Sequence, residues 1–88
     1  MITTEQVTAI AVKIEALGVD ETTVSALRQQ YQPIHFTYCM DDDLPNNTPI
    51  IEHKGFNLYL IDGREHCLCL TNDYEVATGI VVAEIIAD

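Results

Sequence analysis

The chain has 88 residues, 48% of them hydrophobic, which suffices for one packed core and is too apolar for a disordered segment. Four Lys and Arg residues against fourteen Asp and Glu residues give a formal net charge of −10. This charge repels phosphate backbones and anionic lipid headgroups, so it disfavours binding to nucleic acids and to membrane surfaces. It either keeps a small protein soluble or favours a partner with a basic surface.

The chain carries no pattern of secretion or membrane insertion. No apolar run approaches the roughly 20 residues that span a bilayer, and the first ten residues lack the basic and apolar regions of a secretory signal. The odd number of cysteines argues against a disulfide framework. We therefore expect a cytoplasmic protein with a single domain over residues 1–88.

Residues 3–17 predict an amphipathic helix. Thr3 and Gln6 can form a capping box at its start, and Gly18 can supply the left-handed position after its end. The apolar residues that recur at helical spacing are Val7, Ile10, Ala11, Ile14 and Leu17.

A second helix is predicted after Asp20, which is a good N-cap, and Pro33 forbids its continuation. Its buried stripe is marked by Val24, Leu27 and Tyr31. Because the connection between the two helices is short, we expect them to form an αα-hairpin.

Residues 34–40, IHFTYCM, alternate as a strand does. The residues expected on one face are Ile34, Phe36, Tyr38 and Met40, and those expected on the other are His35, Thr37 and Cys39. Residues 41–55 then form the long connection of the molecule, rich in Pro and Asn and closed by Gly55.

A β-hairpin is predicted next, with FNLYLI (56–61) and REHCLCLT (64–71) joined by a turn at Asp62–Gly63. Side-chain alternation places one set of residues beneath the helices: Phe56, Leu58, Leu60, Cys67 and Cys69. The other face carries Asn57, Tyr59, Ile61, His66, Leu68 and Leu70. Cys67 and Cys69 are therefore interpreted as small buried hydrophobic residues, while Cys39 projects from the opposite face, so the three thiols cannot meet at one ion.

Asn72 or Asp73 is expected to cap a third helix that continues to about residue 86. Gly79 falls inside this helix, and we interpret it as a close approach of the helix to the sheet. The predicted fold class is therefore α+β with the order α-α-β-β-β-α. It has a small three-stranded antiparallel sheet whose helices pack mainly on one face.

The run HFTYCMDDD places three carboxylates, Asp41, Asp42 and Asp43, at the end of a strand. They either blunt the strand end with charge or form an electrostatic docking patch. We expect them to bind a partner together with the semi-apolar sheet face around Tyr59, Leu68 and Leu70.

A metal site is the alternative, with His35, Cys39 and His66 as ligands for zinc or a similar ion, but no cofactor is expected in the favoured interpretation. His35 and Cys39 lie some 13 Å apart by strand rise, too far to act as base and nucleophile. No catalytic motif is present, so the sequence requires no enzymatic activity.

Four stretches carry a resemblance: HFTYCMDDD (35–43), GFNLYLIDG (55–63), HCLCLTND (66–73) and ATGIVVAEI (77–85). They resemble a small family of uncharacterised bacterial proteins that are commonly encoded among nitrogen-fixation genes. The resemblance covers nearly the whole chain, although the two N-terminal helices are similar in pattern more than in identity. That family has no established active residues that could be assigned to positions of this chain. The resemblance implies the cytoplasm of a nitrogen-fixing bacterium and an accessory role around nitrogenase, its maturation or its electron supply.

The function expected from the sequence is that of a non-enzymatic accessory protein that docks a protein partner, either nitrogenase-related or basic in surface, or a second copy of itself as a homodimer. The alternative is a small metal- or cofactor-binding protein.

Overall fold

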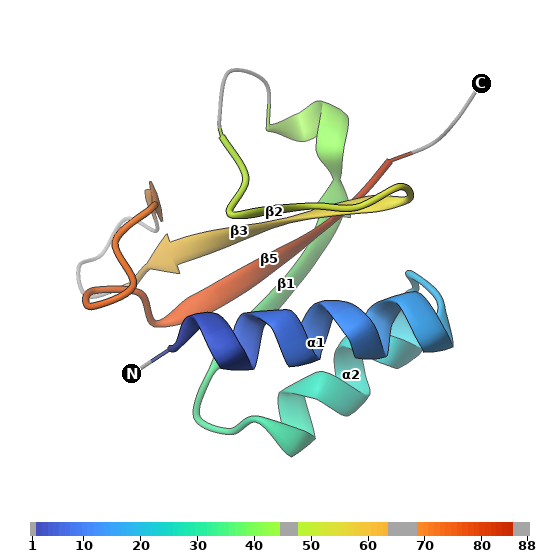
Figure 1. Ribbon diagram of the computed structural model, residues 1–88, viewed down its shortest axis with the longest axis horizontal. Coiled ribbons are helices and arrows are strands. Elements are labelled where there is room, and N and C mark those ends of the chain that lie inside the picture. Colours follow the sequence, from blue (N-terminus) through green and yellow to red (C-terminus); the bar gives the residue numbers. More distant parts are fainter. Residues whose placement is uncertain (1, 45–47, 64–68, 86–88) are drawn as a thin grey trace.

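The computed structural model describes residues 2–44, 48–63 and 69–85 (Figure 1). Two helices are followed by strands, so the α+β class is confirmed. The elements are α1 (Thr4–Leu17), α2 (Glu21–Gln30), β1 (His35–Met40), the short 3-10 helix η1 (Asp41–Asp43), β2 (Ile51–Glu52), β3 (Phe56–Asp62), β4 (Cys69–Thr71) and β5 (Gly79–Glu84).

Both helices begin and end where their capping residues predict. Thr3 and Gln6 bond reciprocally in a capping box at the start of α1. After α1, Gly18 has a φ of +99°, a conformation that residues with a Cβ rarely adopt. The Asp20 carboxylate accepts a 2.8 Å hydrogen bond from the Thr23 amide and so caps α2.

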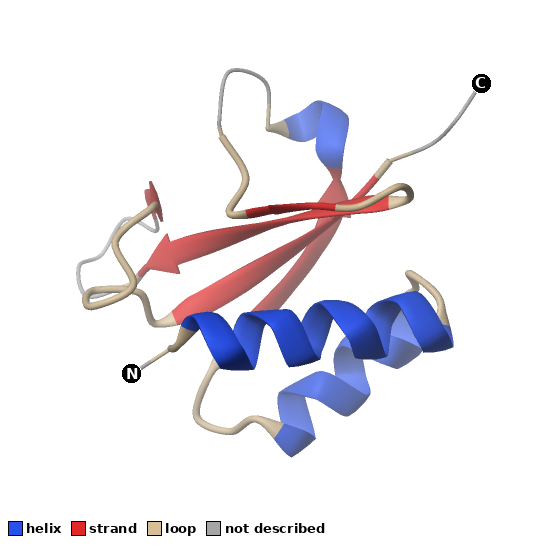
Figure 2. Ribbon diagram, viewed as in Figure 1, coloured by secondary structure: helices blue, strands red, loops and turns tan. Residues whose placement is uncertain are grey.

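The two helices lie on one side of the sheet, as predicted (Figure 2). They bury an apolar stripe against it, formed by Val7, Ile10, Ala11, Ile14, Val24 and Leu27. Leu17 was expected in this stripe, but it is 57% exposed. Among the described residues, no helix is long and apolar enough to cross a membrane.

The sheet has five strands and is mixed, so the predicted three-stranded antiparallel sheet is wrong. Its order is β1-β5-β3-β2, with β4 also paired to β3. β5 lies in the centre, parallel to β1 and antiparallel to β3. The long connection after β1 also differs from expectation, since it contains η1 and β2.

The predicted third helix is the largest error, because residues 79–84 form β5. Asp73 does act as a local cap, since its carboxylate accepts a hydrogen bond from the Glu75 amide, but the chain makes only a turn there. The apolar run that follows is buried on both faces, with Ile80 and Val82 toward the helices and Val81 and Ala83 toward the opposite side. Such a run is typical of a central strand.

Gly79 marks a close approach, but between strands. A Cβ placed on Gly79 would lie 2.8 Å from the carbonyl oxygen of His35 on β1, the strand with which it pairs. Because this neighbour is backbone, it cannot move aside without displacing β1. The glycine therefore permits the parallel pairing of β1 with β5.

The hairpin after β3 has a different register from the predicted one. A two-residue turn at Asp62–Gly63 would pair Cys69 with Phe56. Cys69 instead pairs with Asp62, so the predicted turn is wrong. The register is shifted by an even number of residues, so Cys69 still lies on the same face of the sheet as Leu60, as predicted. Its side chain is nevertheless exposed, because β4 pairs only at the end of β3. Cys67 lies outside the described residues.

Candidate functional site

The first aspartate of the acidic run is fixed to the sheet. Asp41 follows β1 directly, and its Oδ1 accepts hydrogen bonds from the Asn57 side-chain amide at 3.0 Å and from the Tyr59 hydroxyl at 2.8 Å. Both donors project from β3 on the face opposite the helices, and both are buried. Asp41 therefore anchors η1 on the sheet. It also accepts hydrogen bonds from two buried donors that would destabilise the fold if they had no acceptor.

The other two aspartates of η1 are exposed. The turn is closed by a hydrogen bond from the Leu44 amide to the Asp41 carbonyl, and the Leu44 side chain packs against the sheet. Asp42 and Asp43 point their charges into solvent from this turn. Because the residues on both sides of them are fastened, the two carboxylates are presented from a defined place.

The sheet face around this anchor forms a second, smaller apolar cluster. Its buried members are Tyr59, Ile61, Val81 and Ala83, and the half-buried residues that pack on them are Cys39, Leu44 and Leu70. Of the predicted docking face, Tyr59 is only 3% exposed, Leu70 is half-buried and Leu68 lies outside the described residues. Tyr59 therefore serves as an internal anchor and offers little exposed surface to a partner.

Charge and burial act together on two groups of this cluster. Burial raises the pKa of the Cys39 thiol, and the nearby carboxylates of Asp43 and Asp41 raise it further. Burial also raises the pKa of Tyr59, and its hydrogen bond to Asp41 adds to this effect. Both groups therefore stay neutral at physiological pH, so the thiol is poorly suited to nucleophilic chemistry.

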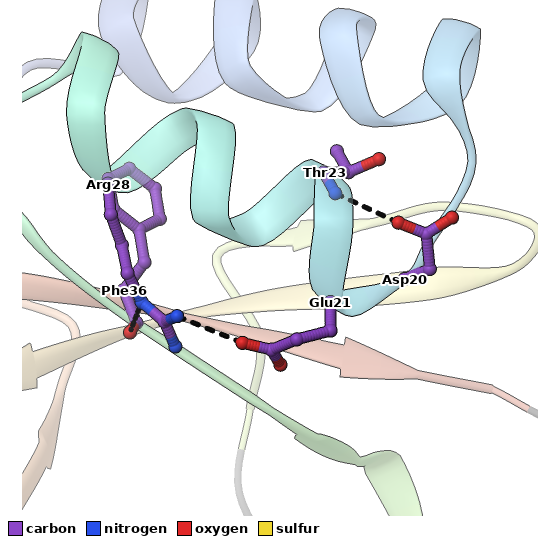
Figure 3. Close-up of polar contacts among 5 residues, drawn as sticks. All are labelled: Asp20, Glu21, Thr23, Arg28 and Phe36. Atoms are coloured by element: carbon purple, nitrogen blue, oxygen red, sulfur yellow. Dashed lines mark hydrogen bonds and ion pairs between the residues drawn. The ribbon is translucent and has the colours of Figure 1, made fainter.

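The outer edge of β1 is the other surface rich in polar contacts. Arg28 on α2 donates a 3.1 Å hydrogen bond from Nε to the Phe36 carbonyl and forms a 2.9 Å ion pair with Glu21 (Figure 3). Two residues farther along β1, the Tyr38 hydroxyl donates to the Glu84 carboxylate. This bond, with burial and the negative charges of nearby acidic residues, raises the pKa of Tyr38 to about 12.

Comparison with known proteins places the chain in a family. The family model described as "Family of unknown function (DUF6129)" matches residues 8–85, nearly the whole chain. The chain belongs to the DUF6129 family. No significant match is found among curated proteins or among solved structures. Membership in DUF6129 agrees with the expected resemblance to an uncharacterised family, and it assigns no activity to the site.

The predicted metal ligands of this DUF6129 protein lie as follows. His35 is exposed at the start of β1, Cys39 is half-buried near its end, and His66 lies outside the described residues. His35 and Cys39 are four positions apart on the strand, which separates their Cα atoms by roughly 13 Å, farther than the two side chains can reach to one ion. The described part of the chain contains no group of three or more His, Cys, Asp or Glu residues placed to hold a metal.

Sequence reasoning missed three polar residues of the DUF6129 protein: Arg28, Asn57 and Glu84. The role of Asn57 could have been predicted from the sequence, since a polar side chain within the apolar strand FNLYLI needs a buried partner. The roles of Arg28 and Glu84 could not, because they depend on β1 forming the edge of the sheet beside β5.

Proposed function

We propose that this protein is a non-enzymatic interaction protein that docks a partner with a basic surface through Asp42 and Asp43. The observation that carries the proposal is the fastening of η1. Asp41 is bonded to Asn57 and Tyr59, and this arrangement presents the next two carboxylates in solvent without the entropy loss of ordering a loose loop on binding.

The charge of the whole chain supports this proposal. A net charge of −10 on 88 residues speeds the encounter with a basic surface and suppresses acidic partners. The half-buried Leu44 and Leu70 pack on the apolar cluster of the same sheet face and can add apolar contact area. The docking surface is therefore Asp42 and Asp43 with a small apolar rim.

We further propose that the protein acts in the cytoplasm, in association with nitrogen fixation. The resemblance of the stretches 35–43, 55–63, 66–73 and 77–85 to proteins encoded among nitrogen-fixation genes supports this context. Under this proposal the partner belongs to nitrogenase, its maturation or its electron supply. Deletion of the gene in a nitrogen-fixing host should slow growth on dinitrogen and leave growth on ammonium unchanged; equal growth in both media would contradict the association.

Quantitative affinity capture tests the docking surface. The wild-type protein, the double variant Asp42→Asn/Asp43→Asn and the control Glu5→Gln/Glu75→Gln would each be used as bait in extracts of nitrogen-fixing cells. The control removes the same two charges at exposed positions elsewhere in the chain. We expect one protein to be enriched by the wild type and the control and to fall at least about tenfold with the double variant.

Recovery of that protein should also decrease as NaCl is raised from about 50 mM to about 500 mM, because exposed charges are screened over shorter distances at high salt. Equal recovery of the same partner by all three baits would remove Asp42 and Asp43 from the docking surface.

A further inference from the structure

We propose that the outer edge of β1 receives an extended, Lys- or Arg-bearing segment of the partner as an added strand. This inference rests on the proposed function, since it names the form in which the basic partner binds. Strand addition uses main-chain hydrogen bonds for affinity and alternate side chains for specificity.

The main-chain groups of β1 are divided between its two edges. The His35 amide bonds to the Thr78 carbonyl, which fixes the phase of the parallel ladder with β5. Residues 35, 37 and 39 therefore direct their main-chain groups toward β5, and residues 36, 38 and 40 direct theirs outward. The bond from Arg28 to the Phe36 carbonyl agrees with this phase, because it reaches that carbonyl from the outer side.

β1 is the long edge of this sheet. Within the described residues it pairs with β5 alone, over six residues, whereas β2 at the other end of the strand order has two. β1 contains neither proline nor lysine, the residues that commonly block edge pairing. Arg28 takes one outward carbonyl, but its side chain is 44% exposed, so an incoming amide can replace it.

Carboxylates lie on the helix side of this edge and past the end of β1. Glu21 lies on the helix side, where it is paired with Arg28, and Glu84 is bonded to Tyr38. Asp42 and Asp43 follow the last residue of β1. A second copy of the chain would bring the same charges to the edge and be repelled, whereas a basic segment would be attracted. Charge complementarity therefore selects a basic partner over self-pairing.

A hollow beside the start of β1 accommodates side chains of such a segment. Its volume is about 740 Å³, and it is lined by Arg28, Gln32, Pro33, Ile34, His35, Phe36, Thr37, Ile61, Gly63 and Thr78. None of these lining residues is a carboxylate, and several are apolar. Because side chains alternate along a strand, the occupant should place apolar residues toward the hollow and basic residues toward the flanking acids.

A model peptide tests this inference. The probe is an eight-residue peptide of alternating valine and lysine, and the control is the same peptide N-methylated at every residue, which keeps the charge but has no amide hydrogen to donate. Amide hydrogen exchange of the isotope-labelled protein would be followed by NMR. We expect the probe to slow exchange at Phe36, Tyr38 and Met40 by at least about tenfold, while Thr37 and Cys39, already bonded to β5, change little.

A matched pair of variants separates strand addition from charge attraction. Met40 has a φ of −87°, close to the value that proline requires, and its amide faces outward, so Met40→Pro removes one edge donor with little strain. Met40→Leu keeps the amide. The probe should bind Met40→Leu as it binds the wild type, and Met40→Pro at least about fivefold more weakly.

Three outcomes would overturn the inference. Equal binding of the N-methylated peptide would show that charge alone holds the segment, and docking through Asp42 and Asp43 would stand. Protection of the β1 amides that rises with protein concentration in the absence of peptide would show that a second copy is the occupant. Capture of the partner by Met40→Pro at the wild-type level would refute the edge as its docking site while leaving the proposed function intact.

Discussion

The Tyr59 hydroxyl donates a 2.8 Å hydrogen bond to the Asp41 carboxylate, which ties the end of β1 to the middle of β3. The bond crosses the sheet face that the helices leave uncovered, and Asn57 donates to the same oxygen. The two donors make the first aspartate of the run a structural residue, whereas the next two are exposed to solvent.

Removal of the Tyr59 hydroxyl should loosen this anchor. We expect Tyr59→Phe to lower the free energy of unfolding by about 1–2 kcal/mol, because a buried hydrogen bond to a charged acceptor is lost. Urea unfolding measures the change. Tyr31→Phe, which removes the hydroxyl of a half-buried tyrosine outside this network, is the control and should cost less. Equal losses in the two variants would mean that Asp41 is not held by Tyr59.

Tyr38 should lose its hydroxyl proton only at an unusually high pH. Its pKa is raised from 10.0 to about 12, mainly by the hydrogen bond to Glu84. An ultraviolet titration of tyrosinate in Tyr59→Phe, which removes the other tyrosine whose pKa is raised, should show the transition of Tyr38 near pH 12. Glu84→Gln should move this transition toward the ordinary value by removing the negative charge. An unchanged titration of Glu84→Gln would rule out this cause.

The same pKa shift predicts a loss of stability in alkali. The folded state holds the Tyr38 proton more tightly than the unfolded chain does, so its stabilising contribution is complete below pH 10 and is lost as the pH rises through about 12. Urea unfolding over this range should therefore show a smaller decline for Tyr38→Phe than for the wild type. Parallel declines would contradict the linkage.

Gly79→Ala should destabilise the centre of the sheet. The added Cβ would meet the His35 carbonyl oxygen at 2.8 Å, and we expect a loss of about 1–3 kcal/mol as β1 and β5 are forced apart. Gly55→Ala is the matched control, since no atom lies within 4 Å of its added Cβ, and it should change the free energy of unfolding by less than about 0.5 kcal/mol. A similar effect of both substitutions would remove steric crowding as the cause.

Cys39 should react slowly with alkylating reagents. Burial and the carboxylates of Asp43 and Asp41 keep its thiol protonated, so the rate should rise only at a pH above the ordinary titration range of cysteine. A protein with Cys67→Ser and Cys69→Ser isolates this thiol. Addition of Asp43→Asn should increase its rate at about pH 8.5, and Glu75→Gln should not. An identical rate in both would exclude the influence of Asp43.

The features that the sequence predicted correctly depend on neighbouring residues. Thr3, Gln6 and Asp20 bond to amides within three positions, so the helix starts follow from local chemistry. Side-chain alternation likewise placed Phe36 and Cys39 on opposite faces of β1.

The features that were missed depend on distant parts of the chain. Asp73 does bond to a nearby amide as a helix cap would, but the pairing of residues 79–84 with both β1 and β3 outweighs the local preference. The anchoring of Asp41 was missed for a similar reason, because it requires η1 to fold back over β3.

The position of β5 bears on how the chain reaches its native state. This strand follows every other described element in the sequence, yet it separates β1 from β3 and pairs with both. During synthesis, the ribosome releases two strands that have no direct pairing with each other before it releases the one that joins them. β3 can pair with β2 and β4 before then, but β1 can join the sheet only when residues 79–84 are available. Until then β1 and the β5-facing edge of β3 are exposed to chaperones or to aggregation.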